Sequence, residues 1–290
     1  MKTAALLLPL LSLALLAGCS KTEEPTKPKV ASERAAPAGY LEKIKARDKL
    51  IVGVFTDKPP FGFVDESGRY VGFDTDIGRR FAKDLLGDEN KVEFVAVEPA
   101  SRIPFLQSDK VDLILANMTV TPERKEAVEF TNPNLKVAVQ ALVPQGSSVQ
   151  KLDDLATRTT IVTTGTTADI WLTKTHPDWK LLKFEKNSES LQALANGRGD
   201  AYAQDNLVLF SWAKQNPGYR VLEEKLGAEA PIAPAVKKGN LELRDWVNSE
   251  LAKLGEEKYL LKLYDQYVRK ELSDDTRPES VIVEGGKWQG

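Results

Sequence analysis

The sequence predicts an α/β fold with two lobes, because the chain is long and strand and helix patterns alternate along it. It has 290 residues, of which 42% are hydrophobic. Domains usually contain about 100–150 residues, so this length can bury two modest cores. β-Branched or apolar runs at 49–55, 92–97 and 111–116 alternate with helical spacing at 74–86 and 101–107. Such alternation is typical of a parallel sheet with crossover helices.

The same alternation begins again after Lys151, which predicts a second lobe. Strand patterns at 160–163, 181–184 and 201–204 alternate with helical patterns at 168–174, 189–196 and 206–214. Segment 137–143 joins the two units, and segment 231–236 is suited to run back as a second hinge strand. The amphipathic stretch 241–268 has no second-lobe strand to pair with. We therefore predict that 40–138 with 235–290 form lobe 1, and that 139–234 form lobe 2 with the hinge strands.

The first residues have the features of an export signal. Lys2 precedes an apolar run over 4–17 that is too short for a membrane-spanning helix. Residues 16–19 (LAGC) resemble the bacterial lipobox, which implies that a signal peptide, 1–18, is removed and that Cys19 is lipidated. The alternative for Cys19 is a small buried apolar residue. We expect the mature protein in the periplasm or at the cell surface, anchored to a membrane through Cys19.

Residues 19–39 are rich in Pro, Lys, Glu and Ala and contain almost no large apolar side chain. Burial of such a segment cannot offset its ordering entropy, so we expect a flexible linker. Folded structure should begin near Tyr40. No later run approaches the roughly 20 apolar residues that a membrane helix needs, so only the lipid is expected to touch the bilayer.

Composition excludes several functional classes. The 42 acidic and 40 basic residues leave a net charge of −2, whereas nucleic-acid-binding proteins carry concentrated basic surface. One Cys and one His cannot form an internal disulfide or an all-Cys/His zinc site. The lone imidazole also removes most Ser-His-Asp and Cys-His chemistry. We expect no nucleic acid, no metal and no cofactor.

Thr121 and Pro122 mark a helix start soon after a strand that ends at Asn117. Thr is a good N-cap, and Pro is favoured at the first helical position. Such a turn faces the carboxyl edge of the sheet, where ligands bind in open α/β folds. Arg124 lies in the first helical turn and opposes the helix dipole. This placement favours a specific anionic partner, such as a carboxylate, over a solvated surface cation.

Residues 163–168 (TTGTTA) form the corresponding strand-to-helix turn of lobe 2. Its backbone N–H groups and the hydroxyls of Thr166 and Thr167 could seat an anion, although an ordinary Thr-capped helix fits equally well. A phosphate loop is excluded because the Gly-Lys-Ser/Thr ending is missing. Asp205, at the end of another strand, is either an N-cap carboxylate or a seat for an ammonium group. One binding site for a cation beside two binding sites for an anion would suit a zwitterionic ligand.

Two further side chains are candidates at the same edge. Phe61 follows the first strand and either fills the core or covers the apolar stem of a ligand. Arg102 starts a first-lobe helix and is either a surface residue or a contact for the polar side chain of a ligand.

In this order, the motifs resemble those of amino-acid-binding lipoproteins of ABC importers. This extracytoplasmic family has the type II periplasmic-binding-protein fold, with two α/β lobes, two hinge strands and a ligand cleft between the lobes. The resemblance covers nearly all of 40–290. Its most specific pieces are 111–124 (VDLILANMTVTPER), 165–168 (GTTA) and 199–201 (GDA), the last leading to Asp205.

The resemblance also implies roles for the candidate residues. Arg124 would bind the ligand α-carboxylate, assisted by the hydroxyl side chains of Thr119, Thr166 and Thr167. Asp205 would bind the α-ammonium group, and Phe61 would pack on the ligand. Asn117 and Arg102 complete the candidate ligand-binding set.

Segments 165–169, 205–206, 232–240 and 283–287 most resemble the cysteine-binding branch of the family, so cysteine is the first expectation for the ligand. Arg102 is also found at this place in glutamate/aspartate binders. An acidic amino acid, or glutamine, therefore remains an alternative ligand.

The resemblance implies a monomeric protein that is not an enzyme. It would bind a free small polar L-amino acid by lobe closure and deliver it to ABC permease subunits in the inner membrane. A dehydratase-type enzyme on the same fold is the rival from another class; it would need an acid/base carboxylate facing the substrate. A surface adhesin with a relic pocket is a third alternative, which the intact Arg124 and Asp205 disfavour.

Overall fold

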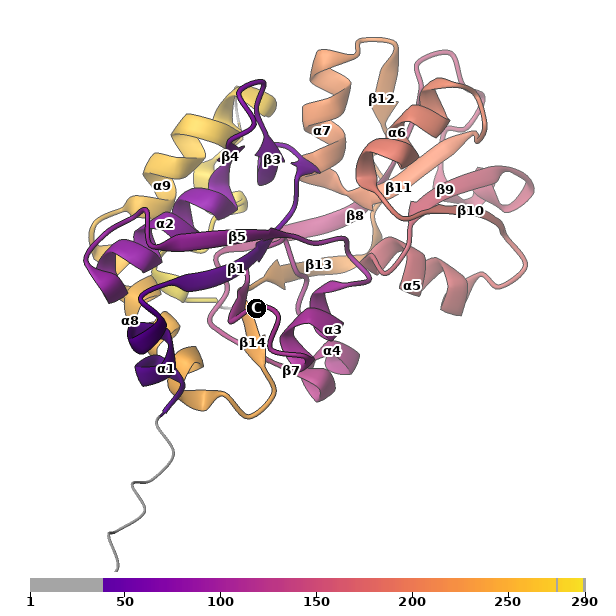
Figure 1. Ribbon diagram of the computed structural model, residues 1–290. Coiled ribbons are helices and arrows are strands. Elements are labelled where there is room, and N and C mark those ends of the chain that lie inside the picture. Colours follow the sequence, from indigo (N-terminus) through magenta and orange to yellow (C-terminus); the bar gives the residue numbers. More distant parts are fainter. Residues whose placement is uncertain (1–38, 275, 289–290) are drawn as a thin grey trace, which may run out of the picture. The chain divides into compact units, whose positions relative to one another are not determined.

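The computed structural model describes residues 39–274 and 276–288, which contain two α/β lobes (Figure 1). The predicted signal peptide, Cys19 and nearly all of the predicted linker lie outside the described residues. Helix α1 (Tyr40–Arg47) begins where the sequence predicts folded structure to start. Within the described part of the chain, no helix combines the length and the apolar character needed to cross a membrane.

Lobe 1 is built on a five-stranded sheet. Its strand order is β5 (Val92–Ala96), β1 (Leu50–Val54), β6 (Leu113–Ile114), β14 (Ala235–Lys237) and β7 (Val128–Phe130). The first three strands are parallel, with Val52 opposite both Phe94 and Leu113, whereas β14 is antiparallel to both neighbours. A small antiparallel sheet follows β1 and consists of β2 (Asp57–Lys58), β3 (Gly62–Val64) and β4 (Tyr70–Val71).

Successive residues of β1 enter two different cores, one on each face of the sheet. Leu50, Val52 and Val54 lie in the larger core, which also contains residues of α2 (Phe73–Leu86) and α8 (Leu241–Glu256). Ile51 packs against the smaller core, to which α3 (Arg102–Gln107) contributes. This is the two-residue period of a strand that helices cover on both faces. The short helix α4 (Pro122–Ala127) leads directly into β7.

Lobe 2 repeats this plan on a second sheet. The strand order is β10 (Lys180–Phe184), β9 (Thr159–Thr163), β11 (Ala201–Asp205), β8 (Leu135–Pro144) and β12 (Tyr219–Val221), and β13 (Leu226–Ile232) also pairs with β8. Strands β10, β9 and β11 are parallel, and β8 runs antiparallel to β11.

The helices of lobe 2 are α5 (Thr167–Thr175), α6 (Asn187–Ala195), α7 (Asn206–Gln215) and the 3-10 helix η1 (Leu152–Thr157). Ile161 and Tyr202 share a core with residues of α6 and α7, whereas Val162 and Ala203 share one with α5. The predicted strands and helices of this lobe are confirmed to within two residues at each end.

The two predicted hinge segments differ in detail from the structure. Segment 137–143 is the centre of β8, a full member of the lobe 2 sheet. Segment 231–236 divides between two sheets, because β13 ends at Ile232 in lobe 2 and β14 begins at Ala235 in lobe 1. Pro234 lies in the crossover, where the missing N–H donor of proline suits a break between two ladders.

The predicted amphipathic stretch over 241–268 divides into separate helical elements, and its apolar side chains pack in the lobe 1 core. Helix α8 ends at Glu256, and a separate helix α9 (Tyr259–Leu263) continues into one π-helical turn, η2 (Tyr264–Val268). Lys258 adopts the left-handed conformation, φ 53°, at the break. The Glu284 carboxylate accepts hydrogen bonds from the N–H groups of Leu260 and Leu261, so a distant residue satisfies the start of the new helix.

The last described segments are three 3-10 helices, η3 (Arg269–Glu271), η4 (Pro278–Ser280) and η5 (Glu284–Gly286). Element η5 packs closely on α8: a Cβ atom on Gly255 would lie 2.4 Å from the Cα atom of Gly285. Helix α8 also contacts α1, β7 and β14. The C-terminal helices therefore pack on the lobe 1 sheet.

Candidate functional site

A small cavity lies between the two lobes, near the carboxyl ends of β1, β6, β9 and β11. It is lined by Phe55, Lys58, Pro99, Arg102, Asn117, Thr119, Arg124, Thr166, Thr167, Gln204 and Asp205. This set includes seven of the eight predicted ligand-binding residues. Within the cavity, the centre of a water molecule could occupy a volume of only about 10 Å³. Side chains therefore fill most of the space between the two lobes.

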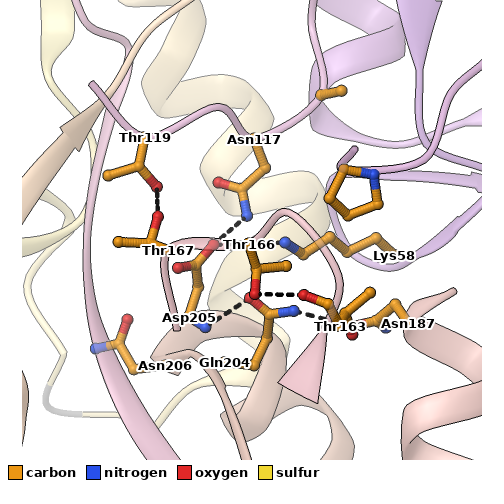
Figure 2. Close-up of polar contacts among 12 residues, drawn as sticks. Lys58, Asn117, Thr119, Thr163, Thr166, Thr167, Asn187, Gln204, Asp205 and Asn206 are labelled. Carbon is orange, nitrogen blue, oxygen red and sulfur yellow. Dashed lines mark hydrogen bonds and ion pairs between the residues drawn. The ribbon is translucent and has the colours of Figure 1, made fainter. Parts of the chain in front are cut away.

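Asp205 is the carboxylate that lines the cavity, and its side chain points toward Asn117 and Lys58 (Figure 2). It is the last residue of β11 and precedes α7, but its side chain makes no capping hydrogen bond to that helix. Its Oδ2 atom instead accepts a hydrogen bond from Asn117 Nδ2 at 3.0 Å and lies 3.4 Å from Lys58 Nζ. Both partners come from lobe 1, so this carboxylate is directed across the cleft and does not serve as an N-cap.

Arg124 occupies the helix start that the sequence predicts. The Thr121 side chain accepts a hydrogen bond from the Arg124 N–H, and Pro122 is the first residue of α4. The guanidinium is buried; it donates to Thr119 O at 2.8 Å and, across the cleft, to Gly165 O at 3.0 Å. Its partners are therefore backbone carbonyls, which carry no net charge.

Arg102 is also buried, which excludes the surface alternative for this residue. It donates to Pro99 O at 3.0 Å and to Ala116 O at 3.0 Å, and its Nη2 atom lies 3.5 Å from Gly165 O. Burial lowers the pKa of Arg102, and the neighbouring Arg124 guanidinium lowers it further. Two guanidinium groups thus share one carbonyl oxygen, an arrangement that favours an anion beside them.

The predicted threonine turn forms the lobe 2 wall of the cavity. Thr166 is the N-cap of α5, and its hydroxyl accepts a hydrogen bond from the Asp169 N–H. The Thr167 hydroxyl donates to the Thr119 hydroxyl at 3.0 Å, which links the lobes (Figure 2). Gly165 has φ +78°, and a Cβ atom there would lie 2.8 Å from Ala100 Cα of lobe 1. Only glycine allows so close an approach in this conformation.

Positive charge is in excess in the cavity. Lys58, Arg102 and Arg124 line it together with a single carboxylate, that of Asp205. Burial lowers the pKa of Lys58, and the Asp205 carboxylate opposes this effect. Such a constellation suits a ligand that supplies at least one negative charge. Among residues 39–274 and 276–288, no group of three or more His, Cys, Asp or Glu side chains is arranged to hold a metal ion.

The Phe61 prediction is wrong for this cavity. Phe61 is fully buried in the lobe 1 core and does not line the site. Hydrogen bonds from Phe73 N to Pro60 O and from Asp74 N to Phe61 O hold the segment against the start of α2, which directs the ring into the core. The aromatic ring that lines the cavity belongs to Phe55, directly after β1.

Sequence reasoning missed Phe55, Lys58, Pro99 and Gln204. The position of Phe55 could have indicated its role, because it directly follows a parallel strand, and ligands bind at the carboxyl ends of such strands. Asp205 lies at the end of another parallel strand. Lys58 had none, since lysine side chains are almost never fully buried unless paired. Its partner Asp205 is distant in sequence and lies in the other lobe.

A family model for the bacterial extracellular solute-binding proteins, family 3, matches residues 50–270. The chain belongs to this family. The match covers most of both lobes and includes every residue that lines the cavity. The predicted two-lobe α/β fold is confirmed by solved structures to which this family 3 protein is similar.

Relatives of the family 3 protein carry names with different ligands. A glutamine-binding protein of Geobacillus stearothermophilus is 40% identical over 228 residues, which cover 77% of this chain and 87% of that protein. A cysteine-binding protein structure from Campylobacter jejuni is 44% identical with a TM-score of 0.84, covering 85% of this chain and 100% of that one. An L-cysteine solute receptor from Neisseria gonorrhoeae is 45% identical with a TM-score of 0.82, covering 84% and 99%.

Proposed function

We propose that this protein is the amino-acid-binding component of an ABC importer, and that it binds a small polar L-amino acid by closure of its lobes. One observation carries the proposal: a buried carboxylate, Asp205, lies in the same interlobe cavity as the guanidinium groups of Arg102 and Arg124. The Asp205 carboxylate suits the α-ammonium group of an amino acid, and the two guanidinium groups suit its α-carboxylate. Binding to both lobes stabilises the closed form selectively.

Cysteine is the first candidate for the ligand. The solved structures described above are named for cysteine, and they cover 85% and 84% of this chain, which supports this choice. Glutamine is the main alternative, because the Geobacillus stearothermophilus relative is named for it. Glutamate and aspartate are further alternatives, which the excess of cationic groups in the cavity supports.

Delivery and location complete the proposal. Membership of an extracellular solute-binding family supports a location outside the cytoplasm. We propose that Cys19 carries the lipid anchor and that the closed, liganded form docks on permease subunits in the membrane. Mass spectrometry of the mature N-terminus tests the anchor, which requires a lipid-modified Cys19 as the first residue.

The ligand is tested by a thermal-shift screen of the purified protein against the twenty amino acids and cystine. A ligand present at about 1,000 times its dissociation constant stabilises the native state by about 4.1 kcal/mol. For a protein of this size, this corresponds to an increase of roughly 8–16 °C in Tm. Stabilisation by none of these compounds would contradict the proposal.

The site is tested with Arg124→Ala and Asp205→Asn. We expect each to weaken binding of the best ligand by at least about 100-fold, because each loses a charge-assisted hydrogen bond to a fully desolvated group. Isothermal titration calorimetry measures the affinity, and thermal unfolding verifies the fold. Arg158→Ala is the matched control, since Arg158 lies in lobe 2 with its side chain 43% exposed. Unchanged affinity in either site variant would remove that residue from the site.

Names of the matched relatives describe binding proteins, which supports a binding role over the dehydratase alternative. A direct turnover assay with prephenate-like substrates tests the alternative. No consumption of substrate is expected.

A further inference from the structure

Lys58 is a buried cation that the roles proposed above do not use. It lies in the two-residue strand β2 at the start of the small hairpin sheet, and its side chain is 3% exposed. Its ammonium lies 5.1 Å from the centre of the Phe55 ring and 3.4 Å from Asp205 Oδ2. Within the described residues, Asp205 is its one hydrogen-bond acceptor. An ammonium has three donors, so two of them have no protein acceptor among the described residues.

The proposed ligand would compete with Lys58 for its partner. Under the proposed function, the α-ammonium group of the ligand binds Asp205, the carboxylate with which Lys58 pairs. Asn117 Oδ1, in the same cavity, is buried and has no donor among the described residues, so it offers that ammonium group a second acceptor. One carboxylate would then face two ammonium groups, so the charge of Lys58 would be compensated less completely. A new acceptor for Lys58 would therefore stabilise the complex.

The two arginines cannot accept a hydrogen bond from Lys58, and a zwitterionic ligand does not reduce the positive charge of the cavity. Arg102 and Arg124 are themselves cations, and their hydrogen bonds run to backbone carbonyls. The α-carboxylate of the ligand balances one positive charge, but its α-ammonium adds another. The excess of positive charge in the cavity is thus the same with a neutral zwitterion as without it. Only a second negative group on the ligand reduces this excess.

We propose that Lys58 is the specificity-determining residue of the site and that it binds an anionic side-chain group of the ligand, a thiolate or a carboxylate. This inference rests on the proposed function. For cysteine, the ordinary pKa of the thiol is about 8.5. An adjacent ammonium favours the thiolate, so the proton is released to solvent on binding. Aspartate and glutamate bring their carboxylates already ionised. Asp205, Arg102, Asp57 and Asp74 are charged groups that act on Lys58, and Arg124 lines the same cavity.

The test compares the wild-type protein with Lys58→Met, which keeps the length of the side chain and removes its charge. Calorimetry measures the affinities for three matched pairs of ligands: cysteine and serine, aspartate and asparagine, glutamate and glutamine. We expect the wild-type protein to prefer the anionic member of its best pair by at least about tenfold. In Lys58→Met, this preference should fall to within about threefold. Lys83→Met, on the exposed surface of α2, is the control and should leave the preference unchanged.

Proton release identifies the anion. Titration of cysteine at pH 7 in two buffers with different ionisation enthalpies should show the release of close to one proton by the wild-type protein. It should show almost none with Lys58→Met, and aspartate and glutamate should show none with either protein. If the pair that binds most tightly contains an acidic amino acid, the carboxylate form of the proposal is supported. Proton release with cysteine supports the thiolate form.

The possible failures are distinguishable. If the wild-type protein binds no amino acid, the proposed function and this inference fall together. If it binds amino acids and Lys58→Met folds with the same preference for the anionic ligand, only the inference is overturned. Tighter wild-type binding of glutamine than of glutamate, with affinity independent of Lys58, would likewise overturn the inference and leave the proposed function intact.

Discussion

At the scale of single residues, a buried carboxyl group supports the site from behind. Asp74 is 1% exposed, and its Oδ2 atom accepts a hydrogen bond from the Asn117 N–H at 3.1 Å. Asn117 has a positive φ of 43° and carries the amide that contacts Asp205. Asp74 thus holds Asn117 in an uncommon backbone conformation. It positions a cavity residue without lining the cavity itself.

Asp74 also makes stability depend on pH. Burial raises its pKa from 3.8 to about 6, so the folded state binds this proton more tightly than the unfolded state. The free energy of unfolding should therefore decrease as pH rises from about 4 to about 6 and stay lower above that range, by at most about 3 kcal/mol. Asp74→Asn removes this titration, so its profile should be flatter than that of the wild-type protein. Urea unfolding between pH 4 and pH 8 measures the difference, and parallel profiles would contradict this role.

At the scale of elements, lobe 1 supplies the cap of a lobe 2 helix. The N–H of Ser188, in the first turn of α6, donates to Asp57 Oδ2 at 2.8 Å, and Asn187 Nδ2 donates to Asp57 O at 3.3 Å. Asp57 belongs to β2, directly before Lys58. A carboxylate at a helix N-terminus satisfies free N–H groups and complements the helix dipole. The cap can form only when the lobes are in contact.

Asp57→Ala is therefore expected to weaken ligand binding through loss of this cap, and not through loss of a contact with the ligand. An N-cap contributes about 0.5–2 kcal/mol, which corresponds to an increase of about 2- to 30-fold in the dissociation constant. Asp154→Ala is the matched control, because Asp154 accepts hydrogen bonds from the N–H groups of Gln150 and Lys151 within lobe 2. The control should lower stability and leave affinity unchanged in calorimetry. Equal affinity in the two variants would show that the interlobe cap does not contribute to closure.

At the scale of the whole described structure, contacts between backbones limit how closely the lobes approach. Gly165 meets Ala100 across the cleft, and its carbonyl accepts hydrogen bonds from the lobe 1 arginines. Contacts between Thr119 and Thr167 and between Asn117 and Asp205 lie beside it. Closure therefore depends on a position where no side chain is tolerated.

Gly165→Ala should block full closure. Its Cβ atom would lie 2.8 Å from Ala100 Cα, so we expect ligand affinity to fall by at least about tenfold, in addition to about 1 kcal/mol of backbone strain. Gly197→Ala carries a similar strain at φ +69° with nothing within 4 Å and serves as the control for strain alone. Calorimetry measures the affinity, and small-angle scattering with ligand measures the closure. A liganded Gly165→Ala protein as compact as the wild-type protein would contradict this account.

The local features of this protein can be predicted from its sequence. Alternating strand and helix patterns located the lobe 2 elements from β9 to α7, and Thr121 and Thr166 marked helix starts that the structure contains. These signals are readable because capping and periodic burial depend on neighbours close in the chain. Arg124 and Asp205 became candidate site residues because each lies near the end of a predicted strand. Parallel strands bring their carboxyl ends to one sheet edge.

The set of side chains that meet in the cavity depends on how the two lobes pack together. The local pattern around Phe61 is compatible with either a core ring or a ligand contact, and packing against α2 selected the core. Lys58 reads as an ordinary solvated lysine until lobe 2 brings Asp205 to it, 147 residues further along the chain. Such pairings depend on how two separately built sheets approach each other. No period or spacing within one segment carries that information, because the interaction that determines it exists only after both lobes have folded and met.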